Sequence, residues 1–240
     1  MIWQKNGRKV ISFLISVITA TRRNIIPSTS TQEDEDVSEA VPTTDNERID
    51  AMGKYSTMDR VERDYYPTPL KAVIPLAPFM RGKSFIEPCA GDGRLAEHIF
   101  KLQPDSTLVG AYDIEPQKES VLGVPIKQRD IVNDPIEEVY DDVDLFVTNP
   151  PYLNNKQSGY QLNKIILQLS SILPTWLLLN GNYVFNKKSA ECMRFCTDVL
   201  PIGRVKWIED SAMSGKEDSI WALFDSRRKE TQLTYLHPRN

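Results

Sequence analysis

From residue 64 onward, short apolar runs rich in β-branched and aromatic residues alternate with segments whose apolar residues recur at helical spacing. This alternation is typical of a parallel sheet that helices cover on both faces. The pattern predicts seven strands, at residues 84–87, 107–112, 125–127, 144–148, 175–180, 203–208 and 219–224. It predicts helices between most of them, the clearest at residues 94–102, 160–172 and 189–200.

The last two predicted strands are joined by residues 209–219, a segment too short for a comfortable helical crossover. Strands joined in this way pair antiparallel, as a hairpin. The predicted fold is therefore α/β, with a doubly wound, mostly parallel seven-stranded sheet that ends in an antiparallel C-terminal hairpin.

The N-terminal segment differs in character from the rest of the chain. Its apolar run, residues 10–20, is too short to span a bilayer and lacks a clean A-x-A cleavage site. Residues 27–50 are rich in Ser, Thr, Pro and acidic residues, which predicts disorder. We expect residues 1–51 to be disordered, or non-native if translation starts at Met52, followed by one domain over 52–226 and a tail over 227–240. No membrane partner is expected.

The number and spacing of the cysteines indicate the cellular compartment in which we expect the protein. The chain has three cysteines, Cys89, Cys192 and Cys196, and no C-x-x-C pair, which argues against a disulfide framework. We therefore expect a cytoplasmic protein, or one associated with a nucleoid, or with the host cytoplasm if it is viral. With only two histidines in the chain no metal site is expected, so Cys192 and Cys196, on one face of the predicted helix 189–200, should be small core residues.

Charge is unevenly distributed along the chain, whose formal net charge is −4. Residues 52–150 carry 11 basic and 17 acidic residues, whereas residues 151–240 carry 12 basic and 8 acidic ones. The second half is therefore the better candidate to face a polyanion, although solvated surface helices explain the same distribution.

The segment 86-IEPCAGDGRLAEHI-99 places a turn of small residues between a predicted strand and a predicted helix. Gly91 and Gly93 let the backbone reach positive φ and approach a ligand closely, and the helix N-terminus offers free N–H groups. Asp113 ends the second predicted strand, where a carboxylate can accept hydrogen bonds from ribose hydroxyls. Because the loop lacks the full G-x-G-x-x-G pattern, a nucleoside without phosphates fits better than a dinucleotide.

The segment 148-TNPPY-152 follows the predicted strand 144–148 directly. Two prolines cannot continue strand pairing, so an amide side chain and a phenol ring are left at the sheet edge. The Asn149 side-chain oxygen and the Pro150 carbonyl can accept hydrogen bonds from a ligand, and the Tyr152 ring can stack on a planar one. For this motif alone, a strand terminator without chemistry is the alternative.

Together these motifs resemble those of class I S-adenosylmethionine-dependent methyltransferases, of the adenine-N6 DNA methyltransferase kind with γ-type motif order. The resemblance covers residues 64 to about 225. It rests on motifs in family order: 65-YYPTP-69, 87-EPCAGDG-93, Asp113, 129-RDI-131 and 149-NPPY-152.

The resemblance implies a Rossmann-like fold, S-adenosyl-L-methionine as cofactor, and a role for each matched residue. The implied catalytic residues are Asn149, Pro150, Pro151 and Tyr152. The implied cofactor-binding residues are Tyr66, Pro67, Thr68, Glu87, Cys89, Ala90, Gly91, Asp92, Gly93, Asp113, Ile114, Asp130 and Ile131. Among them, the opening motif and the glycine loop would hold the methionine end, Asp113 the ribose, and Asp130 the adenine amino group.

The chain departs from this family because little room remains after Tyr152 for a target-recognition domain. Sequence choice would then come from residues 153–160, 181–189 and 209–219, from the tail, or from a separate specificity partner. The candidate phosphate contacts are Lys156, Lys187, Lys188 and Lys216, each explained equally well as a solvated side chain.

The implied function is methyl transfer to the N6 amine of adenine in a nucleic acid, with DNA as the first choice. One alternative is methylation of another planar amine or amide, in an RNA base or a protein glutamine. Release-factor glutamine methyltransferases and some ribosomal RNA guanine methyltransferases resemble this chain too, but they usually carry a substrate-presenting domain, which we do not expect here. The other alternative is a non-catalytic S-adenosylmethionine-binding protein.

Overall fold

The computed structural model describes residues 66–136, 142–152, 158–207, 217–228 and 233–236. All of them belong to the second of the two units into which the chain divides, Tyr55–Asn240. The expectations for residues 1–51, and for Tyr65 of the opening motif, lie outside the described residues.

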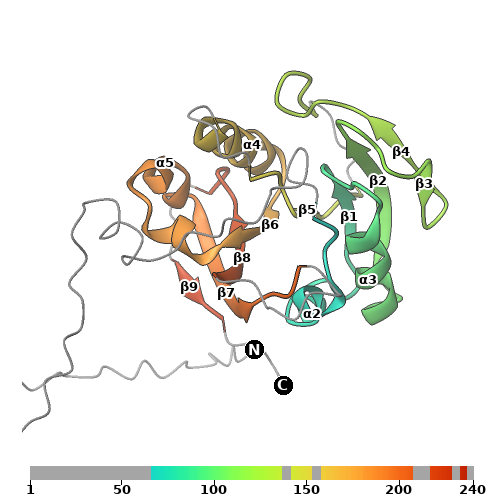
Figure 1. Cartoon of the computed structure of the whole chain (residues 1–240), viewed down its shortest axis with the longest axis horizontal. Helices are drawn as coiled ribbons and strands as arrows, with labels where there is room; N and C mark the ends of the chain where they lie inside the picture. Colours follow the sequence, from blue (N-terminus) through green and yellow to red (C-terminus); the bar gives the residue numbers. More distant parts are fainter. Residues whose placement is uncertain (1–65, 137–141, 153–157, 208–216, 229–232, 237–240) are drawn as a thin grey trace, which may run out of the picture. The chain divides into compact units, whose positions relative to one another are not determined.

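The described residues form a sheet of nine strands in the order β3-β4-β2-β1-β5-β6-β8-β7-β9 (Figure 1). The strands are β1 Ser84–Glu87, β2 Thr107–Asp113, β3 Ser120–Val121, β4 Val124–Gln128, β5 Leu145–Thr148, β6 Thr175–Asn180, β7 Cys196–Arg204, β8 Asp218–Phe224 and β9 Thr234–Tyr235. Pairing is parallel from β4 through β2, β1 and β5 to β6, and antiparallel from β6 to β8 and from β8 to β7. The mostly parallel α/β sheet with an antiparallel C-terminal part is confirmed.

The predicted number of seven strands is wrong, because β3 and β9 were not predicted. Each has only two residues, too few to give a periodic pattern. β3 pairs antiparallel with β4, and β9, which lies within the predicted tail, pairs parallel with β7. Six of the seven predicted strands agree with the structure to within one residue at each end.

The predicted helix over residues 189–200 is wrong, and so is the start of the strand that should follow it. A 3-10 turn η4 (Lys187–Ser189) and the short helix α5 (Ala190–Met193) lead into β7, which begins at Cys196 and not at residue 203. Cys192 and Cys196 therefore lie on a helix and a strand and do not share a helix face. Both are buried in the core, as expected.

Helices cover both faces of the sheet, and Figure 1 shows α2 and α4 on opposite sides of the strands. The remaining helical elements are α2 (Leu70–Val73), η2 (Ala77–Phe79), α3 (Arg94–Leu102), α4 (Ser158–Ile172) and η3 (Gly181–Phe185). α3 has the predicted bounds, and α4 begins two residues before its prediction. No helix in the described ranges is both long and apolar enough to cross a membrane.

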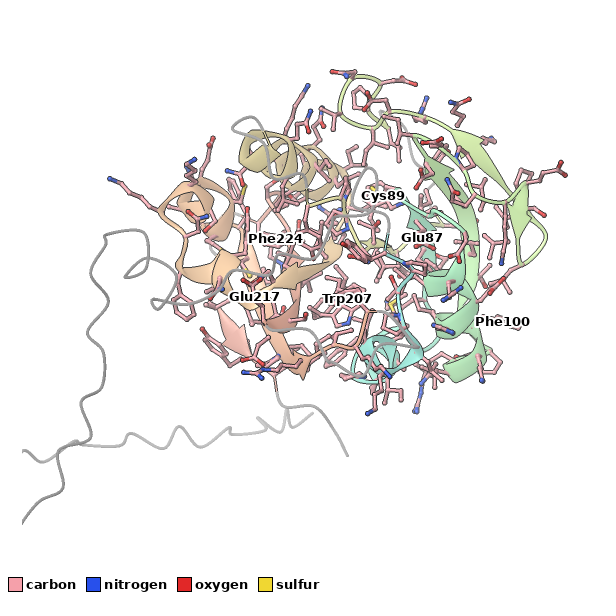
Figure 2. All side chains as sticks on the ribbon, in the orientation of Figure 1. Glu87, Cys89, Phe100, Trp207, Glu217 and Phe224 are labelled. Atoms are coloured by element: carbon pink, nitrogen blue, oxygen red, sulfur yellow. The ribbon has the colours of Figure 1, made fainter. Side chains whose placement is uncertain are left out.

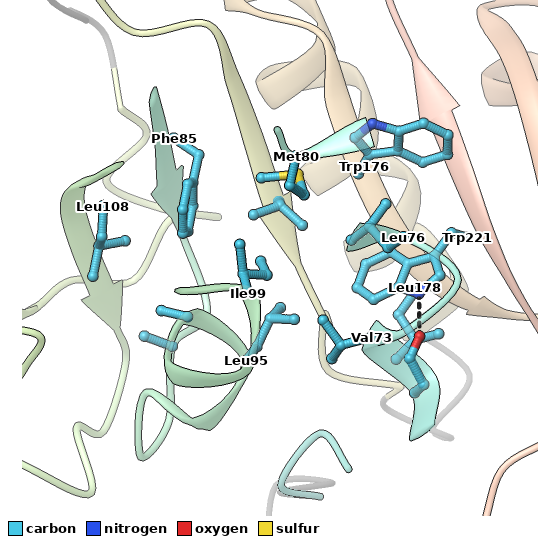
Figure 3. Packing of buried hydrophobic residues seen from close by; sticks show 14 of the residues in the cluster. Val73, Leu76, Met80, Phe85, Leu95, Ile99, Leu108, Trp176, Leu178 and Trp221 are labelled. Carbon is cyan, nitrogen blue, oxygen red and sulfur yellow. Dashed lines mark hydrogen bonds between the residues drawn. The ribbon is translucent and has the colours of Figure 1, made fainter. Parts of the chain in front are cut away.

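Two hydrophobic cores lie on the two faces. The α3-side core includes Leu76, Phe85, Leu95, Ile99 and Leu178 (Figure 3). The α4-side core includes Ile86, Phe146, Ile165, Leu177 and Phe224. Neighbouring residues of one strand divide between the two cores, because successive side chains of a strand point to opposite faces. The doubly wound arrangement is therefore confirmed.

One hydrogen bond ties the start of the described chain to the C-terminal part of the sheet. The Trp221 Nε1–H of β8 donates to the Ala72 carbonyl of α2, with a nitrogen–oxygen distance of 2.7 Å (Figure 3). The Trp221 side chain is fully buried, so this indole N–H has a partner where water cannot reach it. The bond fixes α2, and with it the segment Tyr66–Pro69 that precedes this helix.

Candidate active site

A pocket of about 490 Å³ lies at the carboxyl ends of β1, β2, β4 and β5. This edge is where ligands bind in open parallel sheets. The residues proposed from the sequence that line it are Tyr66, Pro67, Thr68, Glu87, Cys89, Ala90, Gly91, Asp92, Asp113, Ile114, Asp130, Ile131, Asn149 and Pro151. Gly93, Pro150 and Tyr152 are not among the lining residues. The structure thus brings most of the predicted site together around one cavity.

The loop between β1 and α3 is shaped by two glycines with positive φ, +53° at Gly91 and +79° at Gly93. Gly93 is the N-cap of α3 and packs against β3, so a Cβ added there would lie 2.5 Å from the Cβ of Val121. Gly93 therefore shapes the loop but does not line the cavity, whereas Gly91 does line it.

Asp113 joins this loop to the end of β2. Its Oδ2 accepts a hydrogen bond from the Gly91 N–H at 2.7 Å, and its Oδ1 accepts one from the Glu115 N–H at 2.8 Å. An ionised carboxylate has about four acceptor sites, so each oxygen can accept one further hydrogen bond. The arrangement suits a pair of adjacent hydroxyl groups in the cavity.

Glu87 is a buried acid in the wall of the pocket, where β1 ends (Figure 2). Its Oε2 accepts a hydrogen bond from the N–H of Ala96, the third residue of α3, at 3.2 Å. Burial raises the pKa of this carboxyl well above its ordinary value, the Ala96 N–H partly offsets this, and the nearby Asp92 and Asp113 raise the pKa further. Glu87 therefore holds its proton to a higher pH than an exposed glutamate does, while its Oε2 accepts an N–H group from the first turn of α3.

Replacing Glu87 by Gln should flatten the dependence of stability on pH. Because the folded state holds the Glu87 proton more tightly than the unfolded state, the free energy of unfolding falls as pH rises above the ordinary value of 4.5. The slope is at most about 1.4 kcal/mol per pH unit, up to the raised pKa. Glu87→Gln keeps an oxygen for the Ala96 N–H and removes this contribution. Urea unfolding between pH 5 and 8 measures the difference.

The control for this test is Glu97→Gln in α3, whose carboxylate is 44% exposed and paired with Lys118 at 3.1 Å. We expect the control to keep the wild-type slope. Equal slopes for wild type and Glu87→Gln would show that the Glu87 proton is not linked to folding.

Asn149 lies just beyond β5 and is held by the segment before α2. Its Nδ2 donates to the Tyr66 carbonyl and to the Thr68 hydroxyl oxygen, both at 3.2 Å. A carbonyl oxygen can only accept, so the atom facing Tyr66 must be the amide nitrogen. The Oδ1 atom is buried and has no hydrogen-bond partner among the residues that the structure describes. Such an acceptor costs about 1–3 kcal/mol unless a donor reaches it, which points to a ligand that carries an N–H group.

Tyr152 lies away from the cavity. Its hydroxyl donates to the Leu178 carbonyl of β6, and its ring packs against the α4-side core. Burial raises the pKa of this phenol. The stacking role expected from the sequence stays a prediction.

Asp130 lines the pocket, but its carboxylate is already used within its own turn. Oδ1 accepts the N–H groups of Val132 and Asn133 at 3.0 and 3.4 Å, and Oδ2 accepts the Asn133 Nδ2–H at 2.8 Å. In the described structure the Asp130 carboxylate therefore caps the turn that follows β4.

Sequence reasoning missed two pocket residues from α4, Gln161 and Ile165. They lie four positions apart and so share one helix face. The predicted helix 160–172 contained them, but neither belongs to a recognised motif. Of the four candidate phosphate contacts, Lys187 and Lys188 are exposed at η4, whereas Lys156 and Lys216 fall outside the described residues.

Searches by sequence gave no relatives: neither a protein-family model nor a curated protein sequence matches the chain.

Comparison with solved structures did find similar folds. The methyltransferase subunit of a type I restriction-modification system from Streptococcus thermophilus aligns with a TM-score of 0.51 at 11% identity, covering 72% of this chain and 47% of that one. A modification subunit assigned to a type I restriction enzyme from Vibrio vulnificus aligns with a TM-score of 0.51 at 14% identity, covering 80% and 49%. This chain thus spans about half the length of either subunit. At these identities the likeness concerns the fold alone, and the chain has the fold found in the methyltransferase subunits of type I restriction-modification systems.

Proposed function

We propose that the protein is an S-adenosylmethionine-dependent methyltransferase that methylates the exocyclic N6 amine of adenine in a nucleic acid, with DNA as the preferred polymer. The observation that carries the proposal is the buried, unpartnered Oδ1 of Asn149 beside a nucleoside-sized pocket, with its amide orientation fixed by the Tyr66 carbonyl. A buried oxygen without a hydrogen-bond partner in the described structure can accept a hydrogen bond from a substrate amine.

The pocket suits the cofactor in size and in chemistry. Its volume of about 490 Å³ falls within the range of roughly 300–1,000 Å³ typical of small-molecule sites. Asp113 offers two carboxylate oxygens to ribose hydroxyls, and Gly91 lets the backbone approach closely. When bound, S-adenosylmethionine supplies a methyl group on a positively charged sulfur.

The protein's contribution to the reaction is to orient the amine. The lone pair of an exocyclic amine is delocalised into the base ring, which makes the nitrogen a poor nucleophile. Asn149 Oδ1 accepts one N–H bond, and we assign the second N–H bond to the Pro150 carbonyl. Holding both hydrogens turns the lone pair toward the methyl group. No strong base is required, because the nitrogen can lose its proton after transfer.

Two observations favour nucleic acid as the substrate. The fold is shared with subunits whose names refer to restriction-modification systems. In addition, the half of the chain after the pocket motif carries the positive excess, including the exposed Lys187 and Lys188. Because those similar proteins are subunits, we also propose that a separate partner supplies sequence specificity. We place the catalytic domain at residues 52–226, with the tail adding β9.

The direct test uses the full chain with cofactor carrying a radiolabelled methyl group and three unmethylated substrates, namely duplex DNA, RNA and a protein extract. Label recovered as N6-methyladenine from the DNA digest is the expected result. Label in RNA or protein alone would move the proposal to the alternative substrates. Cofactor binding without label in any pool would favour a non-catalytic protein.

Replacing Asp113 by Ala should weaken cofactor binding by roughly ten- to a hundredfold. The substitution removes an ionised acceptor for ribose hydroxyls, worth about 1.5–3 kcal/mol, and frees the N–H groups of Gly91 and Glu115. Calorimetric titration with S-adenosylhomocysteine measures the change.

The control for Asp113→Ala is Asp105→Ala, at an exposed acid before β2. This control should bind like wild type. Wild-type affinity in Asp113→Ala would remove Asp113 from the cofactor site.

A further inference from the structure

Gln161, in the first half of α4, is one of the residues that line the pocket. Its Oε1 is buried, and nothing in the described part of the chain forms a hydrogen bond with it. A buried amide oxygen left unpaired is costly, so it suggests a ligand group that donates a hydrogen bond.

Gln161 and Asn149 line the pocket from different elements, α4 and the end of β5. Gln161 shares a helix face with Ile165, which belongs to the α4-side core together with Ile131. Cys89 and Val132 pack against the same core. Asn149, by contrast, is held by the segment before α2. Because Ile165 and Ile131 belong to this core and both line the pocket, we expect Gln161 to border the part of the pocket formed by the residues after β4.

Asp130 leaves little acceptor capacity in that part of the pocket. Three N–H groups from Val132 and Asn133 already point at its two oxygens. Of the roughly four acceptor sites of a carboxylate, one site on Oδ2 therefore remains for a ligand. Gln161 is the pocket-lining side chain on this wall that keeps a buried oxygen free of any partner in the described structure.

We propose, on the basis of the proposed function, that Gln161 recognises the amino edge of the cofactor's adenine. Its Oε1 accepts a hydrogen bond from the 6-amino group, and its Nε2 donates to the adjoining ring nitrogen. A glutamine amide matches adenine in this way because both carry a donor beside an acceptor. The residue thus determines which base the nucleoside pocket takes, a role that the sequence motifs assign to Asp130.

The experiment compares two ligands by calorimetric titration of the full chain. One is S-adenosylhomocysteine, and the other is its 6-deamino analogue, in which purine replaces adenine. Wild type should bind the amino ligand about tenfold more tightly, as one good hydrogen bond predicts. Gln161→Leu should lose about tenfold in affinity for the amino ligand and less than threefold for the analogue, which brings the ratio close to one.

Two further variants make the result specific. Gln168→Leu removes another amide from α4, two turns further along, which also has a buried unpartnered Oε1 but does not line the pocket. It should keep the wild-type ratio. Gln161→Glu keeps an acceptor and should keep part of the preference for the amino ligand, and it serves as the second test if the Leu variant does not fold.

A wild-type ratio in Gln161→Leu would overturn the proposal, and loss of the ratio in Asp130→Asn alone would return the role to Asp130. If wild type binds neither ligand, the proposed function fails and this inference fails with it. If wild type binds both ligands equally, only the inference fails.

Discussion

Asn149→Ala is expected to reduce methyl transfer at least about a hundredfold while the affinity for the cofactor stays close to that of wild type. The substitution removes the buried Oδ1 that we assign to the substrate amine, and preorganised hydrogen bonds of this kind are worth about 10²–10³ in rate. The cofactor should be little affected, because its ribose is assigned to Asp113 on another strand. Single-turnover transfer and calorimetric titration with S-adenosylhomocysteine measure the two effects separately.

The control is Asn182→Ala, which removes an exposed amide in η3. This variant should match wild type in both assays. Parallel losses of transfer and cofactor affinity in Asn149→Ala would mean that the residue supports the pocket as a whole. Undiminished transfer would end the proposal that Asn149 orients the amine.

Gly93→Ala is expected to lower the free energy of unfolding by about 2–5 kcal/mol. The residue has φ +79°, which costs an L-amino acid roughly 1–2 kcal/mol. A Cβ would also lie 2.5 Å from the Cβ and 2.6 Å from the Cγ2 of Val121. Forcing β3 away from α3 adds about 1–3 kcal/mol of overpacking. Urea unfolding measures the sum.

Gly123→Ala separates the two causes, because Gly123 has the same φ of +79° but has no atom within 4 Å of an added Cβ. This control carries the backbone strain alone and should lose only about 1–2 kcal/mol. Equal losses in the two variants would show that the contact with Val121 relaxes freely.

The parts of the fold that the sequence predicted well depend on local pattern. α3 has Leu95 and Ile99 on one face directly after a glycine turn, and β6 contains the continuous apolar run Trp176–Leu179. Both signals lie within the element itself. The same holds for the loop at Gly91 and for Asp113 at the end of β2.

Where the prediction failed, partners distant in sequence decide the structure. Residues 189–200 have apolar residues at helical spacing, yet β7 forms because Cys196–Arg204 pairs along its length with β8. Pro201 stands inside this strand, next to a register shift between Pro201 and Gly203, so a residue that normally ends strands is tolerated. A short window of sequence does not include the partner strand, so it cannot show that this pairing stabilises a strand.

Contacts between elements distant in sequence also involve two residues near the site. The Tyr152 hydroxyl donates to the Leu178 carbonyl of β6. Gln161 lines the pocket from the same face of α4 as Ile165, which belongs to the α4-side core. Both contacts follow from the packing of whole elements.

The hydrogen bond between Trp221 and Ala72 has a consequence for the order in which a ribosome can deliver a working site. β8 lies between β6 and β7 in the sheet, although it is translated after both, so β7 has no place to pair until β8 has emerged. Trp221 on that strand then secures Ala72, 149 residues earlier in the chain, and with it the segment that holds Asn149. Translation proceeds at about 5–20 residues per second. For several seconds the segment Tyr66–Pro69 therefore lines the pocket without the hydrogen bond that holds α2. We therefore expect competence to bind to come late in translation, after every described residue that lines the pocket has been made.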